Sequence, residues 1–253
     1  MPTIETRDGT RLYFKQWGEG PPVVLIHGWP LSSDSWDPVT HFLAENGFRA
    51  IAYDRRGFGR SDQPSGGYDY DTFADDLAAV LDHCAGGRSA ALIGFSMGGG
   101  EVARYLARYG ATAVSRVALV SSVVPYMPRT ENNPDGVPPD VFDEMTDGLL
   151  ADRARFFTGF FKDFFGVGWL DRPVSEEVRH HAWQMAMQAG LLPTLAAARA
   201  FATTDFRPDL ASFTVPTLVI HGTADKTVPI AATAREVATK VPQAQLIEYH
   251  GEA

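Results

Sequence analysis

The chain has one cysteine in 253 residues, and this scarcity excludes several kinds of site. An internal disulfide needs two cysteines, and Cys-rich zinc or iron–sulfur centres need more. Cys84 falls on the apolar positions of a helical pattern, where a small buried hydrophobic residue is expected. We therefore expect no disulfide framework and no Cys-rich metal centre.

Long apolar runs and basic runs are also missing. No stretch approaches the ~18 apolar residues of a membrane helix, and Met1–Asp8 lacks the apolar core of a signal peptide. Lys and Arg number 22 against 31 Asp and Glu, so the formal net charge is −9, and the longest basic run is Arg55-Arg56. A protein that binds a phosphate backbone needs a basic surface. We expect a cytoplasmic protein that binds neither nucleic acid nor membrane, and we leave a homo-oligomer open.

Short apolar runs alternate with helical patterns along most of the chain. The runs are typical of strands covered on both faces and lie at 23–26, 50–53, 90–93, 117–120 and 218–220, with a more alternating run at 245–249 and an edge hairpin around 11–17. The helical patterns lie at 36–46, 71–84, 98–109 and 230–240. This alternation predicts an α/β fold with a mostly parallel sheet flanked by helices.

The alternation stops between about 125 and 208. A Pro- and Asn-rich loop is followed there by helical patterns that carry eight aromatic residues: Phe156, Phe157, Phe160, Phe161, Phe164, Phe165, Trp169 and Trp183. So long an insertion is no simple crossover. We predict a helical lid over residues 125–208 and a core made of 1–124 and 209–253. Half of the aromatic residues are expected to pack inside the lid and half to line an apolar pocket.

Gly94-Phe95-Ser96-Met97-Gly98 matches the G-x-S-x-G pattern between a predicted strand and a predicted helix. That setting is the one a nucleophile elbow requires, with the serine on a strained turn between glycines. A serine that merely caps the helix is the alternative. No G-x-G-x-x-G pattern follows any predicted strand, so a dinucleotide-binding fold is excluded.

Two further segments supply the rest of an acyl-transfer site. His27-Gly28-Trp29-Pro30 follows an early strand, and we expect the backbone N–H groups of Trp29 and Met97 to form the oxyanion hole. His27 is expected to brace this loop rather than to act chemically. Asp225 follows a later strand and is the predicted triad acid, with Asp205 as a weaker rival.

These residues resemble the α/β-hydrolase superfamily, and more narrowly the bacterial aryl esterase, cofactor-free haloperoxidase and perhydrolase group. The resemblance runs nearly end to end and rests on the segments 27–30, 54–61, 69–76, 94–100 and 204–209. It implies Ser96 as nucleophile, Asp225 as acid, and Trp29 and Met97 as oxyanion donors, and it implies an enzyme with no metal site and no cofactor. Pro30 resembles the perhydrolase-competent members. We expect substrate to contact Trp29, Pro30, Phe160, Phe164 and Val228.

The resemblance also implies a histidine base in the loop after the last strand. Aligned without gaps, that histidine would follow Ala253, so we hypothesise that the sequence is truncated or is interrupted by a modified residue. His250 is the one histidine after Asp225, but its use would shorten the segment between acid and base, and a solvated strand-end residue is the preferred interpretation.

The expected function is hydrolysis of small apolar or aryl carboxylic esters through an acyl-enzyme, with perhydrolase and haloperoxidase activity as a side reaction. Ser96 disfavours the dehalogenases and epoxide hydrolases of this fold, which carry aspartate at the elbow. Two alternatives stay open: a lactonase or amidase of the same mechanism, and a non-catalytic ligand-binding protein if the chain ended at Ala253.

Overall fold

The computed structural model describes residues 1–168 and 173–252, so Trp169 lies outside it. A single sheet runs through the described part in the order β1-β2-β4-β3-β5-β6-β7-β8. The strands are β1 (Thr3–Glu5), β2 (Arg11–Trp17), β3 (Pro22–Ile26), β4 (Arg49–Tyr53), β5 (Ala90–Phe95), β6 (Val114–Val120), β7 (Thr217–Gly222) and β8 (Ala244–Tyr249). β1 and β2 are antiparallel, and the other strands are parallel to one another. The predicted α/β architecture is confirmed.

The predicted helices of the core are present, but the last one, α7, begins four residues later than predicted. The helices are α1 (Asp37–Glu45), α2 (Tyr70–Cys84), α3 (Met97–Tyr109), α4 (Pro139–Phe164), α5 (Glu176–Gln188), α6 (Leu191–Thr203) and α7 (Ala234–Lys240). Residues 230–233, predicted as helix, form turns instead, in which Ala232 and Thr233 bond back three residues to Pro229 and Ile230. Within the described residues, no helix is both long and apolar enough to cross a bilayer.

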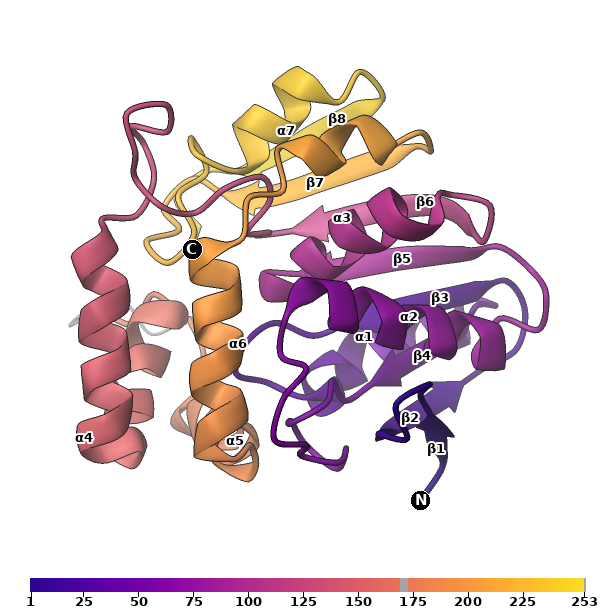
Figure 1. Ribbon diagram of the computed structural model, residues 1–253, viewed down its shortest axis with the longest axis horizontal. Coiled ribbons are helices and arrows are strands. Elements are labelled where there is room, and N and C mark those ends of the chain that lie inside the picture. The colour runs from indigo at the N-terminus through magenta and orange to yellow at the C-terminus, as the bar shows by residue number, and fades with distance from the viewer. Residues whose placement is uncertain (169–172, 253) are drawn as a thin grey trace.

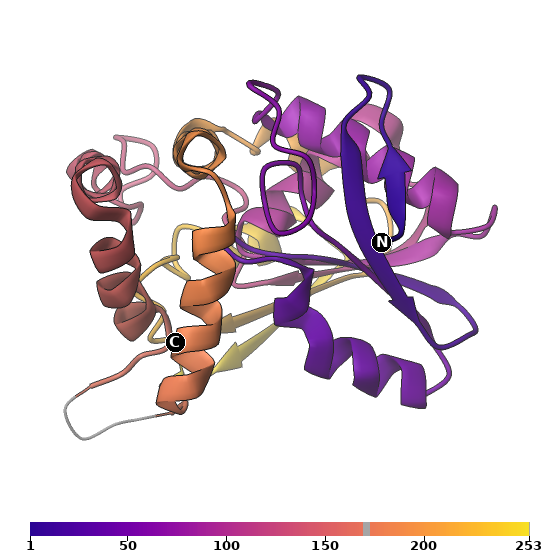
Figure 2. The same cartoon turned by 90° about the horizontal axis from the view of Figure 1, so that it is seen from below.

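Alternate residues of the central strands enter two different cores. Val24 and Ile26 of β3 belong to the large core, which includes α2 and α3, whereas Val23 and Leu25 pack with Leu43 of α1. Figure 2 accordingly shows α1 and α2 on opposite faces of the sheet. Both faces are covered, which explains why the parallel strands are continuous apolar runs.

The chain leaves the sheet after β6 and returns to it with β7. Between them, α4, α5 and α6 lie together to one side of the sheet, beyond the ends of the central strands (Figures 1 and 2). We call these three helices the helical layer. Its position brings it over the loops that follow β3, β5 and β7, from which the candidate site residues come.

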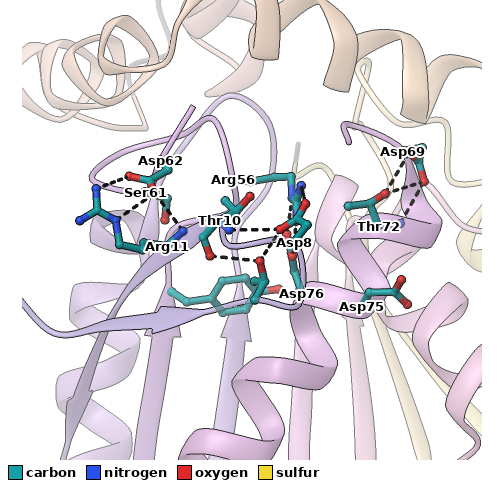
Figure 3. Close-up of polar contacts among 12 residues, drawn as sticks. Asp8, Thr10, Arg11, Arg56, Ser61, Asp62, Asp69, Thr72, Asp75 and Asp76 are labelled. Atoms are coloured by element: carbon teal, nitrogen blue, oxygen red, sulfur yellow. Dashed lines mark hydrogen bonds and ion pairs between the residues drawn. The ribbon is translucent and has the colours of Figure 1, made fainter. Parts of the chain in front are cut away.

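The only pair of adjacent basic residues is buried, so it forms no basic surface. The Arg56 guanidinium donates two hydrogen bonds of 2.6 Å to Asp76 in α2 and two, of 2.8 and 3.3 Å, to Asp8 in the turn between β1 and β2 (Figure 3). Fork-to-fork pairing of this kind fixes orientation as well as distance. Arg56 therefore ties the edge hairpin to α2.

Arg55 is fully buried and joins the loop after β3 to α3. Its Nε donates to Glu101 at 2.7 Å, its Nη2 donates to the His27 carbonyl at 2.9 Å, and its backbone N–H donates to His27 Nε2 at 3.0 Å. Burial lowers the pKa of Arg55 to about 10, so it stays charged at neutral pH. Burial raises the pKa of Glu101 well above its usual value, although the Arg55 Nε lies 2.7 Å from its carboxyl group.

The Glu101→Gln variant is predicted to lose stability, because it leaves the Arg55 charge without a counter-ion in the core. Breaking a buried pair costs about 3–5 kcal/mol, equivalent to a fall in Tm of roughly 6–20 °C at about 2–4 °C per kcal/mol. Thermal unfolding, monitored by circular dichroism, measures this fall in Tm. Glu248→Gln, which breaks the exposed pair with Arg235, is the control and leaves Tm essentially unchanged. A Glu101→Gln variant as stable as that control would show that Glu101 is already neutral.

The His27 side chain makes stability depend on pH in a predictable direction. Burial, and then the Arg55 charge, lower its pKa from 6.5 to about 3. Between these values the unfolded chain binds a proton that the folded chain does not, so the free energy of unfolding falls as pH drops below about 6.5. As the pH falls through that interval, the free energy of unfolding of the unmodified protein should decrease by about 1.4 kcal/mol per pH unit more than that of His27→Gln. Urea unfolding at a series of pH values tests this, and parallel profiles for the two proteins would contradict it.

Candidate active site

Ser96 is the N-cap residue of α3 and has a strained backbone, with φ +51° and ψ −117°. The strain is held by neighbours, because the Ser96 N–H donates to Val120 O at 2.9 Å and the Gly99 N–H donates to Ser96 O at 3.0 Å. A Cβ at Gly94 would lie 2.6 Å from Gly98 O, and one at Gly98 would lie 2.4 Å from Ile26 O. Both flanking glycines are therefore required by the close approach of backbones, as the G-x-S-x-G pattern predicts.

The two glycines after Gly98 bring α3 close to the rest of the core. A Cβ at Gly99 would lie 2.0 Å from the Ser122 hydroxyl, and one at Gly100 would lie 2.6 Å from the Phe206 ring. Neither position has room for a side chain. The first turn of α3 is consequently fixed against β3, β6 and the segment before β7.

The loop after β3 lies directly against the elbow. A Cβ at Gly28 would meet the Phe95 ring at 2.8 Å and the Ser96 Cβ at 3.0 Å. Trp29, which is 3% exposed, donates from Nε1 to Thr194 O in α6 at 3.0 Å, and its peptide bond to Pro30 is cis. Met97 is buried in the first turn of α3, where backbone N–H groups have no partner within the helix. The two expected oxyanion donors thus flank Ser96 from the loop and from the helix.

His27 has the supporting position that the sequence predicts. Its Nε2 accepts the Arg55 N–H, so the neutral ring carries its proton on Nδ1, which lies 3.0 Å from Gly28 O. The ring is fully buried and is not among the residues that line the two pockets at Ser96. Its ring therefore supports the loop after β3 from the interior of the protein, through these two contacts.

Asp225 lies in the turn after β7 and faces the same pocket as Ser96. Its Oδ1 accepts the N–H groups of Thr227 and Val228 at 2.9 and 2.8 Å, and its Oδ2 lies 3.3 Å from His221 Nε2. A pocket of about 590 Å³ is lined by Ser96, Asp225, Gly251 and Glu252, among others. The predicted nucleophile, the predicted acid and the segment after β8 therefore meet.

The two rival residues lie elsewhere. Asp205 binds Arg207 through both carboxylate oxygens, an interaction that lowers the pKa of Asp205. His250 is exposed, and neither residue lines the pockets at Ser96. The base expected one residue beyond Ala253 lies outside the described residues. In residues 1–168 and 173–252, no three His, Cys, Asp or Glu side chains are grouped as a metal site would require.

A second, apolar cavity of about 940 Å³ adjoins the first and shares Ser96, Phe164 and Val228 with it, among others. Of the expected substrate contacts, Trp29, Phe160, Phe164 and Val228 line it. Pro30 does not. It is buried, and the preceding Trp29 supplies the wall at that point.

The aromatic residues of α4 divide between two environments, as the sequence predicts. Phe157 and Phe161 are buried within the core, at 0% and 2% exposure, whereas Phe156, Phe160 and Phe164 line the cavity. The sequence did not indicate the remaining apolar wall, formed by Val123, Met127, Val137, Val141, Phe142, Met145 and Phe201. Val141, Phe142 and Met145 share the helical spacing of α4, whereas Val123, Met127 and Val137 come from the segment before it and Phe201 comes from α6.

The comparisons with known proteins agree with this geometry. The family model described as alpha/beta hydrolase fold matches residues 21–252. The non-heme chloroperoxidase CPO-A1 of Kitasatospora aureofaciens is 42% identical over 251 residues, covering 99% of this chain and 91% of that protein. A bifunctional esterase/perhydrolase of Acinetobacter calcoaceticus is 40% identical over 254 residues, covering 99% and 92%.

A solved structure gives the same result in three dimensions. The bromoperoxidase from Bacillus anthracis superposes with a TM-score of 0.94 at 40% identity, covering 99% of this chain and 91% of that one. The family model and these relatives each span nearly the whole chain. The chain therefore belongs to the α/β-hydrolase fold family.

Proposed function

We propose that this protein is a serine hydrolase that cleaves apolar or aryl carboxylic esters through an acyl-enzyme, with perhydrolysis as a side reaction. The observation that carries the proposal is the position of Ser96, which lies on a strained elbow and lines both the Asp225 pocket and the adjoining apolar cavity. The esterase/perhydrolase and chloroperoxidase named among the relatives support it.

In the acylation step, Ser96 Oγ attacks the ester carbonyl carbon while a general base takes its proton. The backbone N–H groups of Trp29 and Met97 bind the oxyanion that forms, and the start of α3 favours negative charge at this point. The ester C–O bond then breaks, and the alcohol leaves with the proton from the base. Asp225 stabilises the positively charged base, which we propose is a histidine.

In the deacylation step, water attacks the acyl-enzyme, releases the acid and restores Ser96. If hydrogen peroxide takes the place of water, the product is a peracid. The peracid can oxidise bromide to hypobromous acid in solution while it is reduced to the carboxylic acid. Both routes use the same acyl-enzyme. One nucleophile can therefore support the esterase activity and the peroxidase activity for which the relatives are named.

We also propose that residues 125–208 act as a lid over the apolar cavity. The helices of this segment supply most of the cavity wall, and the sheet supplies the nucleophile. A water-poor cavity would strengthen the interactions that stabilise the oxyanion.

The Ser96→Ala variant of the full-length protein is predicted to lose esterase activity by a thousandfold or more, because no other group replaces the nucleophile. Hydrolysis of p-nitrophenyl acetate and labelling by a fluorophosphonate measure the loss. Ser115→Ala, on an exposed position of β6, is the matched control and should retain both. Absence of labelling in the unmodified protein would favour the non-catalytic ligand-binding alternative.

Asp225→Asn is predicted to lower kcat by roughly a thousandfold to ten-thousandfold with little change in KM. The amide keeps an oxygen for the Thr227 and Val228 N–H groups, but it cannot stabilise a charged base. Asp205→Asn, which changes the rival carboxylate, serves as the control and should stay within about twofold of the unmodified protein. The reverse order of effects would assign the acid to Asp205 instead.

A further inference from the structure

His221 is a buried histidine that contacts the predicted triad acid. It belongs to β7, four residues before Asp225, and it is 1% exposed. Its Nε2 lies 2.8 Å from Val228 O and 3.3 Å from Asp225 Oδ2. The ring therefore lies against the turn that carries the acid, on the side that faces the interior of the protein.

The contact with Val228 O determines which ring nitrogen carries a hydrogen. A carbonyl oxygen can only accept, so the His221 nitrogen 2.8 Å from it must be the donor. The Nε2–H group thus donates to Val228 O and, over the longer distance, points toward Asp225 Oδ2. Nδ1 is enclosed, and within residues 1–168 and 173–252 it has no hydrogen-bond partner. The orientation of the ring consequently depends on the Nε2 side alone.

The same arrangement excludes His221 as the general base, although it touches the acid. Its Nε2 already carries a hydrogen that is donated, and its Nδ1 is enclosed. The side chain lines neither of the two pockets to which Ser96 is exposed. It has no route to the proton of Ser96 Oγ. Any effect of His221 on the reaction must therefore pass through the residues that it holds.

The turn that carries Asp225 is bound to its surroundings at both ends. At its start, the Thr223 N–H donates to Tyr249 O in β8 at 2.9 Å. At its end, Val228 O accepts the hydrogen bond from His221. Between these points, Asp225 Oδ1 accepts the Val228 N–H at 2.8 Å, which joins the carboxylate to the far end of the turn. A bond that fixes Val228 therefore also fixes the direction of the Asp225 carboxylate.

We propose that His221 is a positioning residue for the acid: its Nε2–H group holds Val228 and restrains Asp225, so that the carboxylate faces the base. The inference rests on the proposed function, in which Asp225 stabilises the charged base. The contact with Asp225 Oδ2 is long, so it restrains this oxygen and leaves it a lone pair for the base.

The first test compares His221→Gln with His221→Met in the full-length protein, with p-nitrophenyl acetate as substrate. The glutamine Nε2 and the methionine Cε are the same number of bonds from the main chain as the histidine Nε2, but only glutamine has an N–H to donate. His221→Met should lower kcat by about tenfold or more with KM within about twofold, because a displaced acid stabilises the base less well. His221→Gln should keep kcat within about threefold of the unmodified protein. Leu218→Met, a change of similar volume in the same strand, is the control and should leave kcat within about twofold.

The second test repeats His221→Met in the Asp225→Asn protein. A residue that acts through the Asp225 carboxylate has nothing left to position once that group is gone, so the added substitution should change the rate by less than about twofold. The rate is kcat or, where turnover is too slow, the rate of fluorophosphonate labelling of Ser96. A loss of about tenfold in both backgrounds would show a general structural role and would overturn the inference.

The inference is also overturned if His221→Met keeps full activity, or if His221→Gln loses as much as His221→Met. Circular dichroism checks that each variant is folded. If His221→Met does not fold, His221→Asn replaces it, since the shorter amide cannot reach Val228 O and should give the same loss. Failure of the proposed function is recognised separately, because Ser96→Ala would then stay active. Loss of activity in Ser96→Ala and Asp225→Asn but not in His221→Met would refute the role of His221 alone.

Discussion

The close contact between the first turn of α3 and the carboxyl ends of β3 and β6 is the constraint on which the site depends. Gly98 lies against the Ile26 carbonyl, and Gly99 lies against Ser122. These contacts fix the distance between the first turn of α3 and the sheet. That contact keeps Ser96 in a conformation that an isolated peptide would not adopt. One turn further along α3, Glu101 binds Arg55 and, through it, the loop that carries His27 and Trp29.

For Arg55 and Arg56, the sequence excludes one role, binding to nucleic acid, but does not reveal the role they have, which is to form buried ion pairs. The sequence indicates that two adjacent cations are too few for a nucleic-acid surface. It does not indicate that both side chains are buried, because their partners Glu101, Asp76 and Asp8 are distant in the chain. Burial of a charge depends on contacts between elements, which no short window of sequence contains.

The parts of the fold and site that the sequence predicted are those that depend on local spacing. The strands follow from continuous apolar runs, and the elbow follows from the glycines around Ser96. Phe160 and Phe164 were predicted at the substrate and both line the cavity, but the sequence analysis did not assign Phe157 to the interior. The break in α4 was not predicted, although a signal exists: Asp152 Oδ1 accepts the Arg155 N–H at 2.9 Å, which is the action of an N-cap residue within an otherwise continuous helical pattern. The turns at 230–233 were missed because the apolar spacing there does not distinguish a helix from successive tight turns.

The carboxylates Glu101 and Asp225 illustrate how one chain can use the same chemical group in two ways. Glu101 is enclosed in the core, bound to Arg55 and to the Tyr53 hydroxyl, and it lines neither pocket at Ser96, so it cannot contact a substrate or a base there. Asp225 has one oxygen held by two backbone N–H groups of its own turn, while the other has only a long contact of 3.3 Å to His221. The first oxygen fixes the orientation of the group, and the second keeps a lone pair directed into the pocket that Ser96 shares. Because the turn supplies the orienting bonds, the carboxylate faces the pocket without a hydrogen bond to a Lys or Arg side chain among the described residues.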